Sequence, residues 1–232
     1  QVMTLKEHLH KEFPKTCAPD DFFGQVKRTI NGKPVPQEQI DMIIAAIGNN
    51  LNLKEDDVLL DICAGNGALV QGFFSGIKAY LGVDFSEYLI GVAKNNFEKL
   101  PDFRFIVSDA LEYSVNEKQP ENFTKALCYG AFQYLPQEAA EGLLKNLYDR
   151  FKNLKSFFIG NLPDKDRADK FYYADIDYKP LLSDHTTALG IWRSKAEMKT
   201  LAEKHGWKAE IIDMPASFYV SHYRYDIKLT RQ

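Results

Sequence analysis

The sequence contains few cysteines and no long apolar segment. Its three cysteines are far apart and odd in number, and no CxxC spacing occurs, which excludes a disulfide framework and a structural zinc site. No apolar run approaches the ~20 residues that a membrane-spanning helix needs, and the start of the chain lacks a hydrophobic secretory segment. We therefore expect a soluble protein of the cytoplasm, with no membrane partner and no bound metal.

Basic and acidic side chains are nearly balanced in number. The 29 basic and 32 acidic side chains leave a net charge of −3, which gives no electrostatic reason to expect nucleic acid as a partner. With 45% hydrophobic and 13% aromatic residues, the composition excludes an intrinsically disordered chain. The length of 232 residues favours one domain with an added arm or cap.

From Gln37 onward, short apolar runs alternate with helical patterns. We expect helices at 37–51, 87–100, 144–154 and 195–205, and strands at 58–63, 79–84, 103–107, 124–129, 156–160, 209–213 and 223–229. Strands that alternate with helices predict an α/β fold with a doubly wound parallel sheet and right-handed crossovers. The last two strands follow each other closely, which indicates that one of them is inserted antiparallel.

The chain divides at about residue 36. Residues 1–36 are polar and interrupted by prolines, and we interpret them as an arm with short helical pieces that caps the core. Residues 37–232 form the core. Within it, the connection at about 163–192 is longer than usual and rich in aromatic residues, which favours a lid above the ligand crevice that forms the acceptor pocket; a satellite core packed on the sheet edge is the alternative.

The most informative motif is Asp61-Ile62-Cys63-Ala64-Gly65-Asn66-Gly67, at the carboxyl end of the first predicted sheet strand, where we expect it to open the first helix. Glycine there allows a tight turn and lets a ligand approach the backbone closely. Open α/β sheets bind ligands in the crevice outside the carboxyl ends of their strands. An ordinary strand-to-helix turn is the alternative interpretation.

Two further acidic residues occupy the ends of the next two strands. Asp84 ends the second strand, where a carboxylate can accept both hydroxyls of a ribose. Asp109 follows the third strand, where an acid can accept the exocyclic amine of adenine. Each could instead be a helix cap or a loop residue. Together, the three strand ends predict an adenosine site.

A dinucleotide such as NAD is the competing ligand. Its fingerprint, Gly-x-Gly-x-x-Gly/Ala, requires a third small residue, and this sequence has Val70 there. An NAD-dependent oxidoreductase is therefore disfavoured but stays open as a third hypothesis.

The segments Val58–Gly67, Gly82–Ser86 and Ser108–Ala110 resemble the ordered cofactor motifs of class I S-adenosylmethionine-dependent methyltransferases. The resemblance covers roughly residues 38–160. It implies a Rossmann-like sheet of seven strands with the last strand antiparallel, S-adenosylmethionine as cofactor and S-adenosylhomocysteine as product. This sequence departs from the family at Cys63, where glycine is common.

The resemblance also assigns the cofactor's parts to residues. It implies that the Asp61–Gly67 loop wraps the methionine moiety, that the strand end at Asp84 binds the ribose, that Asp109 borders the adenine, and that Tyr129 flanks the transferring methyl group. In the arm, Arg28 or Gln25 could meet the methionine carboxylate. The candidate cofactor-binding residues are thus Arg28, Asp61, Cys63, Ala64, Gly65, Gly67, Asp84, Phe85, Ser86, Asp109, Ala110 and Tyr129.

The acceptor is less well defined. The motifs for methylating exposed adenines, amides or cytosine carbon are lacking, so we expect a small polar metabolite or sugar, methylated on nitrogen or oxygen, and no nucleic acid. His185, the only histidine of the lid, and Tyr134 are the candidate catalytic residues; a structural or exposed role is the alternative for His185. A non-catalytic protein that senses an adenosyl ligand is the second functional hypothesis.

Overall fold

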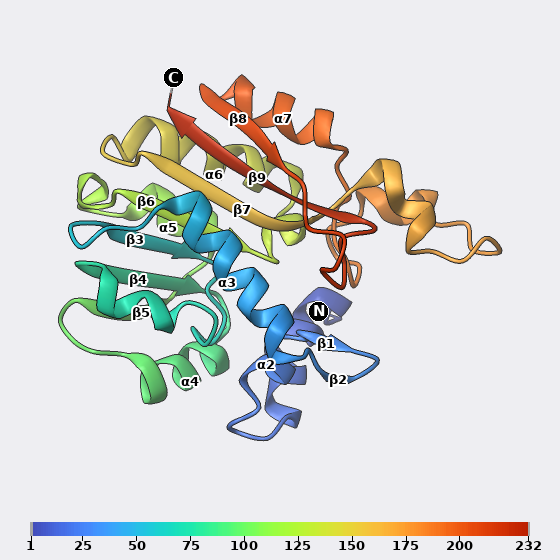
Figure 1. The fold of residues 1–232 in the computed structure, drawn as a ribbon, viewed down its shortest axis with the longest axis horizontal. Coiled ribbons are helices and arrows are strands. Elements are labelled where there is room, and N and C mark those ends of the chain that lie inside the picture. The colour runs from blue at the N-terminus through green and yellow to red at the C-terminus, as the bar shows by residue number, and fades with distance from the viewer. Residues whose placement is uncertain (1, 232) are drawn as a thin grey trace.

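A seven-stranded mixed sheet forms the centre of the molecule in the computed structural model, which describes residues 2–231 (Figure 1). Its strands are β3 (Val58–Ile62), β4 (Ala79–Asp84), β5 (Phe103–Val107), β6 (Lys125–Tyr129), β7 (Ser156–Pro163), β8 (Trp207–Ile212) and β9 (Arg224–Arg231). The apolar runs expected to be strands all lie within or overlap these seven elements. Most residues of β3, β4 and β6 are buried, as in a sheet covered on both faces.

The strand order is β5-β4-β3-β6-β7-β9-β8. Strands β3 to β7 pair in parallel, whereas β9 runs antiparallel to both of its neighbours, β7 and β8. The predicted fold class is confirmed: a Rossmann-like, doubly wound α/β sheet of seven strands in which the last strand is antiparallel. Because β3 to β6 are parallel, their carboxyl ends meet at one edge of the sheet.

Helices cover both faces of the sheet (Figure 1). One apolar cluster joins the sheet to α3 (Gln37–Leu51) and α4 (Glu87–Phe97), and the other joins it to α5 (Ala110–Asn116), α6 (Gln137–Arg150) and α7 (Lys195–Lys204). The predicted stripe of α3 is buried, with Ile47 and Leu51 fully so. The capping box predicted at Ser194 begins α7.

Three helix predictions need correction. The helix expected at 144–154 is α6, which begins at Gln137 and ends at Arg150, so Leu154 lies outside it. The segment after β3 forms a short 3₁₀ helix, Gln71–Gly76, and not the expected α-helix. Two of its six residues are glycines, which are poor helix formers. In addition, α4 ends at Phe97, so Leu100 is exposed and does not pack inward. Pro101 explains this early end, because the residue before proline disfavours helical backbone angles.

The arm lies over the carboxyl edge of the sheet. It contains α1 (Leu5–Glu7), a π-helical turn (His8–Glu12), a 3₁₀ turn (Phe13–Thr16) and α2 (Phe22–Gln25). A small hairpin of β1 (Thr29–Ile30) and β2 (Lys33–Pro34) follows. The sequence analysis missed this hairpin, although Asn31-Gly32, with both residues at positive φ, is a strong hairpin signal.

The segment expected to be a lid contains two 3₁₀ helices, Lys165–Lys170 and Lys179–Ser183. The ring of Tyr172 packs between two other aromatic rings: its centroid lies 4.9 Å from that of Tyr178 and 5.6 Å from that of Trp192. Shorter 3₁₀ turns occur at Pro120–Asn122 and Phe132–Tyr134. Among residues 2–231, no helix is both long enough and apolar enough to cross a membrane.

Candidate functional site

The carboxyl ends of β3 to β6 and the arm enclose a cavity. Ten of the twelve predicted cofactor residues line it, and so does one of the two predicted catalytic residues. The predicted residues in the lining are Arg28, Asp61, Cys63, Ala64, Gly65, Asp84, Phe85, Asp109, Ala110, Tyr129 and Tyr134. The fold therefore brings together residues that are far apart in the sequence. Gly67, Ser86 and His185 are not among the lining residues of the described chain.

Asp84 joins the glycine loop to the end of β4. Its Oδ2 accepts a hydrogen bond from the backbone N–H of Gly65 at 2.9 Å, and its Oδ1 accepts one from the N–H of Ser86, also at 2.9 Å. Burial raises the pKa of Asp84, and the hydrogen bonds from these backbone groups oppose that rise. A carboxylate offers about four lone-pair positions, so two remain available to a ligand's hydroxyls.

Asp61 lies deeper in the cavity wall. It is 3% exposed, and its Oδ2 accepts a hydrogen bond from the hydroxyl of Tyr80 at 2.8 Å. Burial raises the pKa of Asp61 to about 7; the Tyr80 hydrogen bond and the charge of Arg28 lower it, and the charge of Asp84 raises it. Asp61 is therefore a carboxyl group whose charge can change near neutral pH.

The loop after β3 follows a left-handed path. Cys63 has φ of +59°, Gly65 +59° and Gly67 +77°. Gly67 does not line the cavity but packs on Phe105: a Cβ atom on Gly67 would lie 2.6 Å from that ring. Cys63 thus adopts the backbone conformation that favours glycine, the residue common at this position in the family that the sequence resembles.

This backbone makes a prediction for two substitutions at Cys63. Replacement by glycine removes the left-handed strain of an L-residue, and we expect the free energy of unfolding to change by no more than about 1 kcal/mol. Replacement by valine, whose branched side chain fits a positive φ poorly, should lower it by about 1–3 kcal/mol. Urea unfolding measures both. Equal destabilisation by glycine and valine would contradict a left-handed Cys63.

Asp109 and Ser86 begin the helices that follow their strands. Asp109 Oδ1 accepts hydrogen bonds from the N–H groups of Leu111 and Glu112, and Ser86 caps α4 through the N–H of Leu89. Asp109 is exposed and keeps its second carboxylate oxygen free of bonds within the described residues. It can therefore cap α5 and still accept a bond from a ligand, whereas Ser86 is a buried positioning residue.

Tyr129 ends β6 on the cavity wall. Its ring lies directly against Gly160 of β7, where a Cβ atom would come within 2.3 Å of the ring. Burial raises the pKa of Tyr129, so its hydroxyl stays protonated. The guanidinium carbon of Arg28 lies 5.5 Å from the centre of this ring.

The structure distinguishes between the two arm residues proposed for the methionine carboxylate. The side chain of Gln25 is fully used within the protein: it donates to the carbonyls of Ala18 and Pro19 and accepts from Asn66 Nδ2 at 3.0 Å. Arg28 lines the cavity, and within residues 2–231 its guanidinium makes no hydrogen bond or ion pair. Arg28 is therefore free to bind an anion, and Gln25 is not.

Sequence reasoning missed two arm residues that line the cavity, Lys6 and His10. Lys6 Nζ donates to the carbonyl of Tyr134 at 2.6 Å. Burial lowers the pKa of His10 to about 4, so its imidazole is neutral at neutral pH. Their position depends on how the arm folds back over the sheet edge, and no local sequence signal marks it.

The candidate catalytic residues lie in different places. Tyr134 lines the cavity, but its hydroxyl donates to the carbonyl of Ala188 at 2.7 Å, and burial raises its pKa. His185 is half-buried in the predicted lid, and none of the described residues of 163–192 lines the cavity. Its catalytic role stays a prediction. Within residues 2–231, no group of three or more metal-ligating side chains occurs.

Comparison with known proteins supports the sequence motifs. Residues 59–153 match the family described as "Methyltransferase domain". Similar solved structures include a methyltransferase from Clostridium acetobutylicum described as S-adenosylmethionine-dependent, with 15% identity, a TM-score of 0.62, and 88% of this chain and 95% of that chain covered. No curated protein matches the sequence.

Two other similar structures carry different substrate descriptions. The magnesium protoporphyrin IX methyltransferase of Synechocystis is 14% identical, with a TM-score of 0.60 and coverage of 100% of this chain and 99% of that one. A small RNA methyltransferase, HEN1, is 13% identical, with a TM-score of 0.61 and coverage of 86% and 25%. These likenesses support the fold and leave the acceptor open.

Proposed function

We propose that the chain is a class I S-adenosylmethionine-dependent methyltransferase whose acceptor is a small polar metabolite or sugar, methylated on oxygen or nitrogen. The observation that carries the proposal is the cavity at the carboxyl edge, which the arm covers with Lys6, His10 and Arg28. A covered cavity suits a small acceptor better than an extended polymer. The near-neutral charge and the lack of a nucleic-acid methylation motif agree with this. Location in the cytoplasm stays a prediction from cysteine usage.

We place the cofactor along the strand ends. Asp84 accepts the two ribose hydroxyls, Asp109 and Ala110 border the adenine, and the Asp61–Gly67 loop surrounds the methionine. The guanidinium of Arg28, which makes no ion pair within residues 2–231, pairs with the methionine carboxylate through a two-pronged contact. This arrangement leaves the methyl group near Tyr129 and Gly130.

S-adenosylmethionine supplies an electrophilic methyl group when it is bound. The acceptor's lone pair would displace sulfur from the methyl carbon, the carbon–sulfur electron pair would remain on sulfur, and the acceptor's proton would leave to water or a base. Positioning supplies much of the acceleration in such an in-line transfer. The chain's task is therefore to hold both reactants in line and keep the cavity closed. A base is needed only for an acceptor that must lose its proton before attack.

Calorimetric titration tests the cofactor assignment first. We expect S-adenosylmethionine and S-adenosylhomocysteine to bind with micromolar affinity, about −8 kcal/mol, and NAD not to bind. NAD is disfavoured because its pyrophosphate needs a helix N-terminus after β3, where this chain has a short 3₁₀ helix. Binding of NAD in place of the adenosyl ligands would overturn the proposal. Binding without methyl transfer to any fraction of a metabolite extract would favour a non-catalytic sensor.

A further inference from the structure

Beside the cavity, near Gly130, three side chains each carry a buried polar atom that lacks a hydrogen-bond partner among the described residues. The buried atoms Gln133 Oε1, Asn161 Oδ1 and Arg224 Nε have no hydrogen-bond partner within residues 2–231. Native proteins rarely leave buried polar atoms unpaired, and each case requires an explanation. We call Gln133, Asn161, Tyr219, Tyr223 and Arg224 the Arg224 cluster.

Arg224 is a buried cation without a counter-ion. It is 6% exposed, and its hydrogen bond is donated from Nη1 to the carbonyl of Asn161 at 2.6 Å. Within the described residues no carboxylate lies within ion-pair distance of it. The nearest acid on its strand face, Asp226, instead accepts a bond from the N–H of Asn161 at 2.7 Å. A buried charge without a partner is costly, so a missing anion is expected here.

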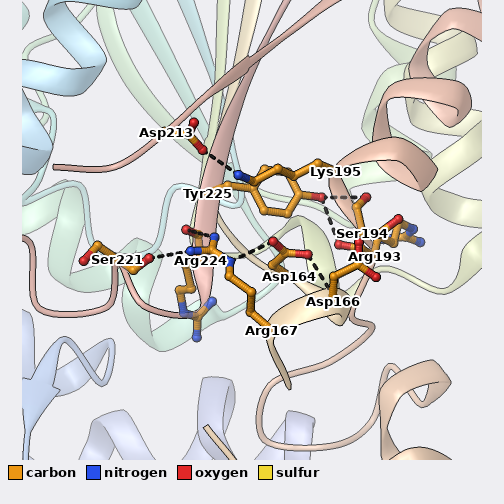
Figure 2. Close-up of polar contacts among 10 residues, drawn as sticks. All are labelled: Asp164, Asp166, Arg167, Arg193, Ser194, Lys195, Asp213, Ser221, Arg224 and Tyr225. Atoms are coloured by element: carbon orange, nitrogen blue, oxygen red, sulfur yellow. Dashed lines mark hydrogen bonds and ion pairs between the residues drawn. The ribbon is translucent and has the colours of Figure 1, made fainter. Parts of the chain in front are cut away.

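The neighbouring Arg167 shows what a fully partnered arginine looks like in this region. It binds Asp164 Oδ2 at 2.8 Å and the carbonyls of Ser221 and Arg224 at 2.7 Å each (Figure 2). In Figure 2 the guanidinium of Arg224 extends away from this ion pair. Its guanidinium carbon lies 5.0 Å from the centre of the Tyr223 ring. Tyrosine hydroxyls can donate to the same anion that an arginine binds.

Asn161 lies next to a residue that lines the cavity. Asn161 has φ of +65° and sits in a register shift between Ile159 and Leu162, where β7 pairs with β9. Such bulges often redirect a side chain beside a functional site. A Cβ atom on Gly130, which lines the cavity, would lie 3.7 Å from Asn161 Nδ2 and 3.9 Å from Arg28 Nη2. The cluster thus adjoins the end of the cavity where Tyr129 and Arg28 lie.

We propose that the Arg224 cluster binds an anionic group of the methyl acceptor, a carboxylate or a phosphate, while Arg28 holds the carboxylate of the cofactor. The inference rests on the proposed function and narrows its substrate class to small acids or phosphorylated metabolites. The planar guanidinium forms two parallel bonds to either group, and the amides of Asn161 and Gln133 and the hydroxyl of Tyr219 complete a polar surface for it. The anion supplies the counter-charge that this region lacks.

The test uses the protein saturated with S-adenosylhomocysteine and measures its melting temperature with inorganic phosphate or acetate, against chloride at equal ionic strength. We expect at least one of the two anions to stabilise the wild-type protein, and R224Q to bind it about 30-fold or more weakly. The matched control is R193Q: Arg193 is also 6% exposed, also carries an unpaired buried nitrogen and donates to Gln137 Oε1 at 2.8 Å, but it lies outside the Arg224 cluster. R193Q should keep the stabilisation, and R224K should keep part of it.

The second readout is methyl transfer by the wild-type protein, so it does not depend on any variant folding. The acceptors come from a metabolite extract that an anion-exchange resin has separated into a retained and an unretained fraction. We expect labelled product from the retained acidic fraction; its loss after phosphatase treatment indicates a phosphate, and its survival a carboxylate. Product only from the unretained fraction, or equal stabilisation of wild type and R224Q, or stabilisation by neither anion, overturns the inference. Failure of S-adenosylhomocysteine to bind at all instead overturns the proposed function.

Discussion

Replacement of Asp84 by alanine should weaken S-adenosylhomocysteine binding more than 100-fold. In the proposed complex its carboxylate accepts two ribose hydroxyls, and a hydrogen bond to a charged group contributes about 1.5–3 kcal/mol, so two contribute at least about 3 kcal/mol. Asp84→Asn keeps the shape of the side chain but lacks its charge, so its affinity for S-adenosylhomocysteine should lie between those of Asp84→Ala and wild type. Calorimetry measures the dissociation constants. Unchanged affinity in Asp84→Ala would show that Asp84 does not bind the ribose.

Loss of Asp84 also releases the N–H groups of Gly65 and Ser86, so the loop itself could loosen. An analogue of S-adenosylhomocysteine without the 2′-hydroxyl separates the two effects in a double-mutant cycle. Wild type should bind this analogue more weakly than the parent ligand, and Asp84→Ala should bind both equally. Asp57→Asn is the matched control. Asp57 is 2% exposed and accepts bonds from Lys54 N and Thr124 Oγ1, but it precedes β3, away from the cavity, so cofactor affinity should persist.

The parts of the site that could be predicted from sequence are local. Asp84 and Asp109 directly follow apolar strand segments, and a parallel sheet places the ends of such strands at one edge. Cys63 interrupts the motif in the sequence, yet the loop keeps its path because the backbone takes a positive φ there. Local pattern and global fold agree at these positions, which is why their gathering at one edge of the sheet could be predicted.

The parts that could not be predicted depend on long-range packing. Gln25 and Arg28 are equivalent candidates in the sequence, and tertiary contacts separate them: the Gln25 side chain is bonded within the protein, whereas Arg28 lines the cavity. Lys6 reaches the cavity through a contact with Tyr134, 128 residues away in the chain. The contact between Arg224 and the Asn161 carbonyl forms at a register shift of β7, which has no sequence signature. Such tertiary contacts decide which polar residues remain free for ligands.

Because of Asp61, the cofactor affinity and the stability of the protein should change with pH in opposite directions. Burial raises its pKa from 3.8 to about 7 in the folded protein, so the charged form is disfavoured there. In the free protein the stability that Asp61 contributes is fully present below about pH 4 and is lost as pH rises through about 7. A shift of about three pKa units corresponds to an upper limit of about 4 kcal/mol. Asp61→Asn should lack this loss and be the more stable protein at pH 8.

The affinity for the cofactor should instead increase with pH, because the methionine part of S-adenosylmethionine carries an ammonium and a sulfonium charge. These charges favour ionised Asp61, so binding lowers its pKa and releases a proton. The affinity should therefore rise with pH by up to about tenfold per unit between pH 5.5 and 7. S-adenosylhomocysteine lacks the sulfonium charge and should show a shallower rise. Asp61→Asn has no ionisable group at this position, so its affinity for both ligands should change little with pH.

Comparison of the two proteins isolates Asp61 from Asp226. Burial raises the pKa of Asp226 to about 6, but its pKa does not depend on Asp61, so its contribution cancels in the difference between the two proteins. The charge of Asp84 acts on Asp61, so the difference measures Asp61 together with its coupling to Asp84. His10, with a pKa of about 4, stays neutral throughout the range. Parallel pH profiles of the two proteins, measured by calorimetry, would show that the cofactor's charge is balanced elsewhere in the cavity.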